Sequence, residues 1–466
     1  MRTIILNTLA LFFLASQIMA VHPRDMKFSP LEFEPPEAEK FVTENGLIVY
    51  FLEDHQLPIL TLNAYFHGGA VHDPEDKAGL GGITATLLRS GGAGDRMPDQ
   101  VDMDLDFVGA SISSSADDDY LSLSMRVLKK DIELGFEILS DMLIKPSFDS
   151  SKFALEISNR KDRIRRQNDD PHDVSRRVYY QTVYTGHPYG VYPTLVSVDN
   201  INRSDVAAQH KHFYNPDNCI MAVSGDIKPE ELKNIIEKYF GGWKKAGIKI
   251  ESPPPAETRY KPGVYYAEKD INQANIRFGH LCMTDKNPDR FPMDVMNFAL
   301  GGGDFSSRLV KQVRTTAGLA YSTGTYLYNR PLMGTLFGYC QTKADQLSAA
   351  LEMMIDIIGE VRENGITAEE MELAKESIIN SYVFNYDTPA KLVNARALLE
   401  LQGFPADQLT RDIEAYQAVT LEKCNEVAGY YLNTDNIVIV ITGNEKLFDK
   451  PLETFGPVTK VSMEIK

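Results

Sequence analysis

The sequence predicts an α+β fold made of two related halves, each a mixed antiparallel sheet with helices packed on it. In each half, strand-like segments come first and helix-like segments follow, whereas a doubly wound parallel sheet would alternate them. The stretch DNCIMAVSGD at 217–226 recurs as DNIVIVITGN at 435–444, and each copy is an Asp-Asn turn leading into an apolar strand. A polar segment with three consecutive prolines lies between the copies. This pattern indicates that one unit is repeated and that a linker joins the two copies. The two halves could face each other across a cavity.

A second pair of segments supports the duplication. Residues 148–164 and 366–382 both begin like helices, with Asp149 and Thr367 as N-cap candidates. Thr367 with Glu370 has the spacing of a capping box. The same offset of 218 residues separates these two segments and the two strand copies. Two landmarks at one offset indicate a repeated unit rather than a chance match.

The domain boundaries follow from the repeat and the linker. We place the first half at 36–245, the proline-rich linker at 246–259 and the second half at 260–466. The apolar content of 43% and charged content of 24% are typical of a folded globular protein. A net charge of −17 argues against a general nucleic-acid binder.

The first twenty residues have the pattern of an export signal. Arg2 is followed by an apolar run at 4–15 and a small-residue cleavage site that ends at Ala20. The run is short for a membrane span, so an uncleaved anchor is the alternative to a cleaved signal. We therefore predict a signal peptide at 1–20, an N-terminal extension at 21–35, and an exported, periplasmic protein with no membrane span after signal removal.

Elements of the first half can be placed in order. Asn45-Gly46 is a hairpin-type turn, and alternating apolar runs follow it as strands. The segment 79–90 predicts a helix, because its leucines and isoleucine recur at near-helical spacing. Further strands are expected around 110–128, and two helices between Lys130 and Arg166.

Metal and nucleophile patterns are weak in this sequence. No two of the nine histidines are spaced i, i+4, and His210 and His212 point in different directions on a helix. His67 and His72 flank a glycine-containing loop and could converge, although a solvated loop explains them as well. The four cysteines are far apart, and Cys219 lies in an apolar strand-like run typical of a buried free thiol. No nucleophile elbow is present.

Two stretches of the second half could carry chemistry. The glycines Gly301, Gly302 and Gly303 form either a flexible turn or a backbone-rich loop that lets a peptide approach closely. Arg314 and Tyr321 flank a predicted helix exit onto a strand. A guanidinium and a phenol held together can donate hydrogen bonds to a carbonyl that gains negative charge, although surface Arg and core Tyr are common.

These stretches carry a resemblance to a known family. NFALGGGDFSSRLVKQVRTTAGLAYS at 297–322 resembles the second-half signature of the pitrilysin and mitochondrial processing peptidase family, the inverzincins. TENGLIVYFLED, GHPYG at 186–190 and FYNPDNCIMAVSGDI at 213–227 resemble its first half in the same order. The resemblance covers about 36–460 and implies two metallohydrolase-like, peptidase-like halves that form a clamshell around a cavity.

The same resemblance implies that the zinc site is lost. The family holds zinc with the two His of an H-x-x-E-H motif on a helix and a later Glu, and the motif's Glu is the general base. Aligned from the Gly-Leu dipeptide before it, the motif falls on Gly82, Ala85 and Thr86, and the later Glu falls on Arg163. Both His, the base and the third ligand are therefore replaced, so no zinc is expected on this chain.

By the same comparison, the Arg/Tyr pair of the second half is intact. Arg314 and Tyr321 match the family's Arg/Tyr pair, which reaches the substrate near the zinc, and Gly301–Gly303 would line the chamber. Arg308 would lie nearby, and the role of Gln273 is left open. The resemblance implies a zinc-less subunit, inactive alone, that pairs with a homologous H-x-x-E-H subunit carrying the zinc and acting on peptides. The alternatives are a peptide-binding or scaffold protein of the same fold, and an enzyme with a relocated metal site.

Overall fold

The computed structural model describes residues 33–465. The predicted signal peptide at 1–20 lies outside these residues, as does most of the N-terminal extension. Residues from Pro35 onward form one compact unit, and the fold below is that of this unit. Within 33–465, no helix combines the length and the apolar character needed to cross a membrane.

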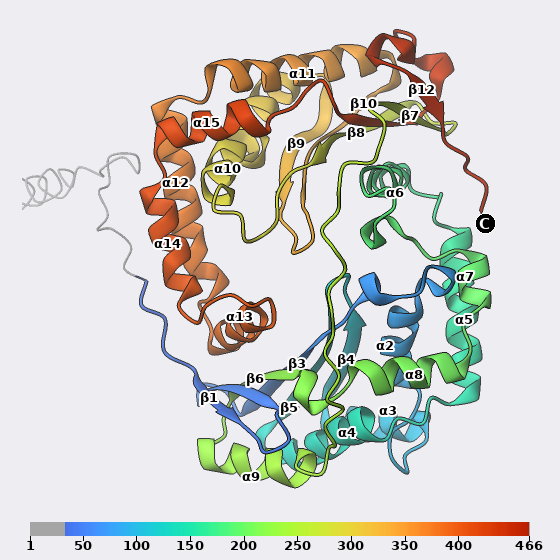
Figure 1. Ribbon diagram of the computed structural model, residues 1–466, viewed down its shortest axis with the longest axis vertical. Coiled ribbons are helices and arrows are strands. Elements are labelled where there is room, and N and C mark those ends of the chain that lie inside the picture. Colours follow the sequence, from blue (N-terminus) through green and yellow to red (C-terminus); the bar gives the residue numbers. More distant parts are fainter. Residues whose placement is uncertain (1–32, 466) are drawn as a thin grey trace, which may run out of the picture. The chain divides into compact units, whose positions relative to one another are not determined.

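Six strands form the first sheet, in the order β1-β2-β6-β3-β5-β4 (Figure 1). Their bounds are β1 Glu39–Val42, β2 Ile48–Glu53, β3 Ile59–His67, β4 Ser111–Ala116, β5 Tyr120–Leu128 and β6 Cys219–Gly225. β2 and β6 pair in parallel, and the other neighbours pair antiparallel. β6 is buried at every position, as its continuous apolar run predicts.

The second sheet repeats this order as β12-β7-β11-β8-β10-β9. Its strands are β7 Gly263–Glu268, β8 Gln273–Leu281, β9 Ala320–Tyr328, β10 Thr335–Lys343, β11 Val438–Gly443 and β12 Val458–Lys460. Only the outermost position differs: β1 precedes β2 in the chain and runs antiparallel to it, whereas β12 comes from the C-terminal end and runs parallel to β7. The predicted α+β fold of two related halves is confirmed.

Helices of the first half are α2 Leu80–Ser90, α3 Pro98–Val108, α4 Ile132–Ile144, α5 Ser150–Arg165, α6 Pro171–Val183, α7 Leu195–Asp199, α8 Arg203–Phe213 and α9 Pro229–Phe240. Helices of the second are α10 Arg290–Asn297, α11 Leu347–Asn364, α12 Ala368–Tyr382, α13 Pro389–Leu401, α14 Gln408–Ala418 and α15 Leu421–Tyr431, with π-helical segments at Phe298–Gly302 and Val310–Thr316. Both predicted N-caps are confirmed, because Asp149 accepts from the backbone of α5 and Thr367 forms a capping box with Glu370.

The two halves exchange one helix each. α6 of the first half packs on β8 and β11 of the second sheet, and α13 of the second half packs on β2, β3 and β6 of the first (Figure 1). Val178 and Tyr179 of α6 join a core cluster with Val438 and Val440, and α13 forms the corresponding cluster against β6. Each sheet is therefore covered on one face by a helix from the other half, which couples the halves through buried apolar surface.

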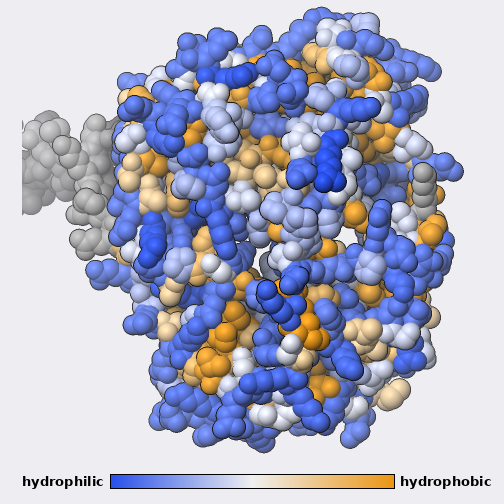
Figure 2. Space-filling view, viewed as in Figure 1, coloured by the Kyte–Doolittle hydropathy of each residue, from blue (hydrophilic) through white to orange (hydrophobic). Residues whose placement is uncertain are grey.

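The segment between the halves runs without helix or strand from the end of α9 to Gly263. It is tied to the second half, because the Ala256 amide donates to the carbonyl of Leu332 at 2.7 Å. The Tyr260 hydroxyl likewise donates to the carbonyl of Asn436 at 3.1 Å. On the face shown in Figure 2 the surface is mainly hydrophilic, with apolar residues in scattered patches.

Candidate functional site

The helix that carries the degenerate motif begins at an unusual cap. Gly79 has a left-handed φ of 102°, which glycine adopts without steric cost. The carboxylate of Asp73 accepts hydrogen bonds from the amides of Gly79 at 3.0 Å and Gly81 at 2.9 Å. These are amides that the start of a helix leaves without intrahelical partners. Asp73 therefore fixes the first turn of α2, a role that the sequence analysis missed.

The three motif positions on α2 offer nothing that could bind a metal strongly or move a proton. Gly82 has no side chain, and Ala85 is buried with 1% of its surface exposed. The Thr86 hydroxyl donates back to the carbonyl of Gly82 at 3.0 Å, one turn earlier. The side chains at these positions thus serve the packing of the helix.

An arginine lies directly over Gly82. A Cβ placed on Gly82 would lie 2.8 Å from Nη2 of Arg160 and 3.1 Å from its Nη1, so the guanidinium fills the space where a longer side chain would begin. Arg160 is on α5, which packs against α2. The absence of a side chain at position 82 is what admits the guanidinium.

Glu156 holds this arginine and Arg163 together. Its side chain is buried, and Oε1 accepts from Nε of Arg160 at 2.7 Å and from Nη2 of Arg163 at 2.9 Å. Arg163, assigned to the third-ligand position, therefore belongs to the same cluster, but Arg160 and not Arg163 contacts Gly82. The pair Glu156 and Arg160 has i, i+4 spacing, a signal in the sequence that could have found the cluster.

Burial has raised the pKa of Asp73 to about 6. The amide hydrogen bonds from Gly81 and Gly79 and the nearby charge of Arg160 oppose this shift but do not cancel it. A carboxyl group that titrates near neutral pH thus lies beside the cluster of Glu156, Arg160 and Arg163.

A cavity of about 540 Å³ opens beside Gly82 and Arg160 and is lined by both halves. The first half contributes Gly82, Arg160 and Asp73, and the second half contributes Tyr328 and Arg330. Further lining residues are Ala70, Ala78, Gly79, Ala116, Asp118, Arg176, Tyr180, Tyr189, Val191, Tyr192 and Pro193. The cavity has the size that small ligands and peptide ends need.

Arg330 joins the halves at the wall of this cavity. Its buried guanidinium donates to Oδ2 of Asp118 at 2.5 Å and lies 3.5 Å from Oδ2 of Asp119. Its Cζ lies 3.3 Å from the ring centroid of Tyr189, whose hydroxyl donates to Asp119. The neighbouring carboxylates and phenols raise the pKa of Arg330 despite its burial. An ion pair and a cation–π contact thus connect the β9–β10 hairpin to the first half.

The glycine-rich stretch is helical and tightly packed at one position. Gly301 lies in the π-helical segment Phe298–Gly302, and a Cβ there would lie 2.5 Å from the amide nitrogen of Thr325 on β9. Only glycine allows this close approach of two backbones. Gly302 is exposed and Gly303 is half-buried, so the segment presents backbone to solvent on one side. Its role in peptide binding stays a prediction.

Arg314 and Tyr321 lie on the surface of the second half. Arg314 is exposed in the π-helical segment Val310–Thr316, and its Cζ lies 5.0 Å from the ring centroid of Phe305. Tyr321 is on the edge strand β9, with 53% of its surface exposed. Neither residue is among the described residues that line the cavity at Gly82. Arg308 is committed elsewhere, in a two-pronged ion pair with Glu370 that agrees with a structural role.

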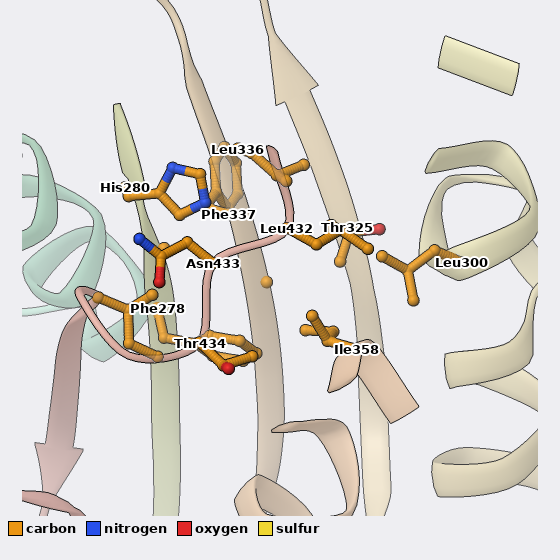
Figure 3. Close-up of a pocket in the computed structure, with 13 residues that line it drawn as sticks. Phe278, His280, Leu300, Thr325, Leu336, Phe337, Ile358, Leu432, Asn433 and Thr434 are labelled. Carbon is orange, nitrogen blue, oxygen red and sulfur yellow. The ribbon is translucent and has the colours of Figure 1, made fainter. Parts of the chain in front are cut away.

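A second cavity lies inside the second half, among Phe278, His280, Leu300, Thr325 and Asn433 (Figure 3). Its volume of about 20 Å³ is enough for a water molecule and too small for a peptide. Burial lowers the pKa of His280, which favours the neutral ring. This cavity is therefore not a substrate site.

The remaining metal candidates do not converge into a site. His72 lies near His212 and His67, and burial together with these two rings lowers the pKa of His72. Across residues 33–465, no three or more His, Cys, Asp or Glu side chains are placed to hold a metal ion. All four cysteines are free thiols, and burial raises the pKa of Cys219.

Comparison with known protein families shows to which family this chain belongs. Residues 49–192 match the family described as "Insulinase (Peptidase family M16)", and residues 200–378 match "Peptidase M16 inactive domain". The chain belongs to the M16 peptidase family. The pitrilysin-like resemblance is confirmed.

Its M16 relatives are distant in sequence but cover most of the chain. "Uncharacterized zinc protease YmxG" of Bacillus subtilis is 23% identical over 87% of this chain and 98% of its own length. "Non-peptidase homolog YmxG" of Helicobacter pylori is 22% identical over 85% of this chain and 92% of its own.

Two solved structures share the fold. A protein from Pseudomonas fluorescens, described as a peptidase M16 inactive domain, superposes with a TM-score of 0.81 at 23% identity, over 90% of this chain and all of that one. The periplasmic protease PqqL of Escherichia coli superposes with a TM-score of 0.74 at 14% identity, over 92% of this chain and 49% of its own.

As an M16 member, this chain has a first half that does not fit the family's zinc. Zinc in proteins is held by Cys, His and carboxylate side chains. Gly82, Ala85 and Thr86 supply none of these, and the Arg160 guanidinium lies against Gly82 as a fixed positive charge. The chain is therefore a non-catalytic member of the M16 family.

Proposed function

We propose that this chain is the zinc-less subunit of a heterodimeric M16 metallopeptidase and that it is inactive alone. A homologous subunit with an intact H-x-x-E-H motif would carry the zinc. The observation that carries the proposal is an asymmetry: the groups for zinc chemistry are absent at Gly82, Ala85, Thr86 and Arg163, while Arg314 and Tyr321 are both present and exposed.

Arg314 and Tyr321 would act on the substrate carbonyl in the partner's site. A guanidinium N–H and a phenolic O–H both donate hydrogen bonds, and donors aimed at a developing oxyanion stabilise the transition state. Their exposure suits a role toward another chain. The glycines Gly301–Gly303 would form part of the chamber wall, where exposed backbone can approach a peptide.

The proposal includes the domain boundaries and an export of the chain to the periplasm. The halves at 36–245 and 260–466, joined by the linker at 246–259, would act as one rigid wall of the peptidase chamber. The pattern of residues 1–20 and the fold shared with a protein described as a periplasmic protease support export to the periplasm.

A second candidate is a peptide-binding or scaffold protein without any peptidase role. The description of the Helicobacter pylori relative as a non-peptidase homolog favours it. In that case Arg314 and Tyr321 would be surface residues with no effect on proteolysis.

Co-expression with an H-x-x-E-H homologue, if one is encoded beside this gene, tests the proposal. We expect no zinc and no peptidase activity in this chain alone, and activity together with one zinc per heterodimer in the complex. Stoichiometric zinc in the chain alone would contradict the assignment of its first half. A stable complex in which this chain adds nothing to the activity of the zinc subunit would favour the scaffold.

A further inference from the structure

In the cavity at Gly82, a guanidinium lies against the position that the sequence pattern aligns with a zinc-binding His. Arg160 uses Nε to bind Glu156, and its Nη1 and Nη2 lie over Gly82 with no hydrogen-bond partner among the residues described. The Glu156 carboxylate is shared by two guanidiniums, those of Arg160 and Arg163. Glu156 alone does not neutralise both guanidiniums, and the nearby carboxylate of Asp73, which interacts electrostatically with Arg160, balances part of the remaining charge.

The other charged groups of the wall are already paired. Arg330 is bound to Asp118, and Arg176 is bound to Asp173. Asp73 interacts electrostatically with Arg160, and its two oxygens accept amide hydrogen bonds from the start of α2. Arg160 thus offers two Nη groups that have no partner among the described residues, and Arg176, which pairs with Asp173 through a single Nη, has further donors in the same wall.

We propose that this cavity binds a peptide through a carboxylate, with the Nη groups of Arg160 as the donors. Paired N–H groups of a guanidinium match the two oxygens of a carboxylate, so Arg is well suited to such a ligand. The inference concerns this chain's own first half and does not rest on the proposed pairing with a zinc subunit.

The rest of the lining favours a peptide. Tyr180, Tyr189, Tyr192 and Tyr328 surround the cavity, and aromatic side chains provide contact area for apolar peptide side chains. Burial raises the pKa of Tyr192 to about 12, so its hydroxyl stays protonated and can donate at neutral pH. The volume of about 540 Å³ admits the end of a peptide rather than a folded protein.

Isothermal titration with short acetylated peptides tests this proposal on the isolated full chain. The probes are an acetylated alanine peptide ending in Phe as the free acid, the same peptide as the amide, and an amide with one internal Glu. We expect the free acid to bind about tenfold or more tightly than the plain amide, as a charge-assisted hydrogen bond provides. Binding of the internal-Glu amide would show that a side-chain carboxylate can replace the C-terminal one.

Variants connect the effect to Arg160. R160Q removes the charge and should abolish the preference for the free acid, whereas R160K should keep only part of it. The matched control is R165Q, which removes an exposed arginine of the same helix and should keep the preference. G82A is the independent variant, because its Cβ displaces the guanidinium without changing any charge, and it should weaken the preference even if R160Q does not fold.

Equal binding of acid and amide would overturn the proposal, as would an unchanged preference in R160Q and G82A. Absence of heat with all three peptides would also overturn it. Inorganic phosphate that displaces the free acid with equal affinity would assign the cavity to phosphate instead. These outcomes leave the heterodimer proposal untouched, since no partner is present.

Discussion

The two halves share one strand order, yet they differ at the helix that follows β3 in the first half and β8 in the second. In the first half, α2 is a regular helix with small residues at positions 82, 85 and 86, and the Arg160 guanidinium lies over Gly82. In the second half, α10 continues into a π-helical segment that packs Gly301 against β9. The first half lacks zinc-binding side chains at these positions and places a guanidinium beside an open cavity, whereas the second half exposes Arg314 and Tyr321.

This difference shows that one half of a duplicated fold can lack zinc-binding side chains while its strand order stays the same. The exchange of α6 and α13 buries apolar side chains of both halves in joint clusters, so neither half can be removed without exposing a sheet face. The residues at positions 82, 85 and 86 are not part of these joint clusters. The first half can therefore lose its zinc groups and still be needed for the fold.

The largest expected effect on stability is that of Arg330→Ala, which tests whether Arg330 couples the two halves at the cavity wall. Replacing Arg330 by Ala leaves Asp118 and Asp119 without their cation and removes the contact with Tyr189. Arg330 is buried while Asp118 is half-exposed, and losing a charge-assisted hydrogen bond together with a desolvated cation–π contact costs about 3 kcal/mol of the free energy of unfolding. Urea unfolding measures this cost.

The control for Arg330 is R411A, an exposed arginine paired within one helix, which should change the free energy of unfolding by about 0.5 kcal/mol at most. Equal stability of R330A and R411A would show that the halves are not coupled through Arg330.

A matched pair of glycine variants sharpens the contrast between the two helices. Gly301→Ala places a Cβ against backbone atoms of β9, which cannot move cheaply, so we expect a loss of about 2 kcal/mol of unfolding free energy. Gly82→Ala meets only the end of the Arg160 side chain and gains helix propensity, so its net effect should stay within about 1 kcal/mol. Thermal unfolding compares the two variants, and an equal cost would refute the contrast.

The smallest effect concerns the cap of α2. Because burial raises the folded-state pKa of Asp73 to about 6, the folded protein binds a proton more tightly than the unfolded chain. This contribution stabilises the fold below the unfolded pKa of about 4 and is lost as pH rises through 6. Asp73→Asn does not titrate, so its stability relative to wild type should rise by about 1–2 kcal/mol between about pH 4 and pH 7. A constant difference across that range would disprove the assignment.

Much of the fold was predictable because its signals are local. Neighbouring residues in the sequence indicate the grouped strands, the helix at 79–90, the caps at Asp149 and Thr367, and the repeat. The exchange of α6 and α13 was not predictable, because nothing within either helix says which sheet it covers. The π-helical segments were missed for a related reason, since their extra residue per turn depends on packing against β9.

The helix of the candidate site was predictable, but the contacts made on it were not. Counting along the sequence located Gly82 and Arg163, yet the guanidinium that lies over Gly82 belongs to Arg160. This contact joins two helices that are distant in sequence, so spacing alone could not choose between arginines on one helix face. Asp73 was missed because its carboxylate caps a helix from outside that helix.

The most direct test of the central claim is the peptidase rate of the reconstituted heterodimer with Arg314→Ala and, separately, Tyr321→Phe in this chain. Arg411→Ala and Tyr430→Phe are the matched exposed controls of the same half. The account predicts a fall in kcat of about a hundredfold for each test variant, the usual cost of an oxyanion donor, with zinc content and complex formation unchanged. Wild-type rates in both test variants would contradict it.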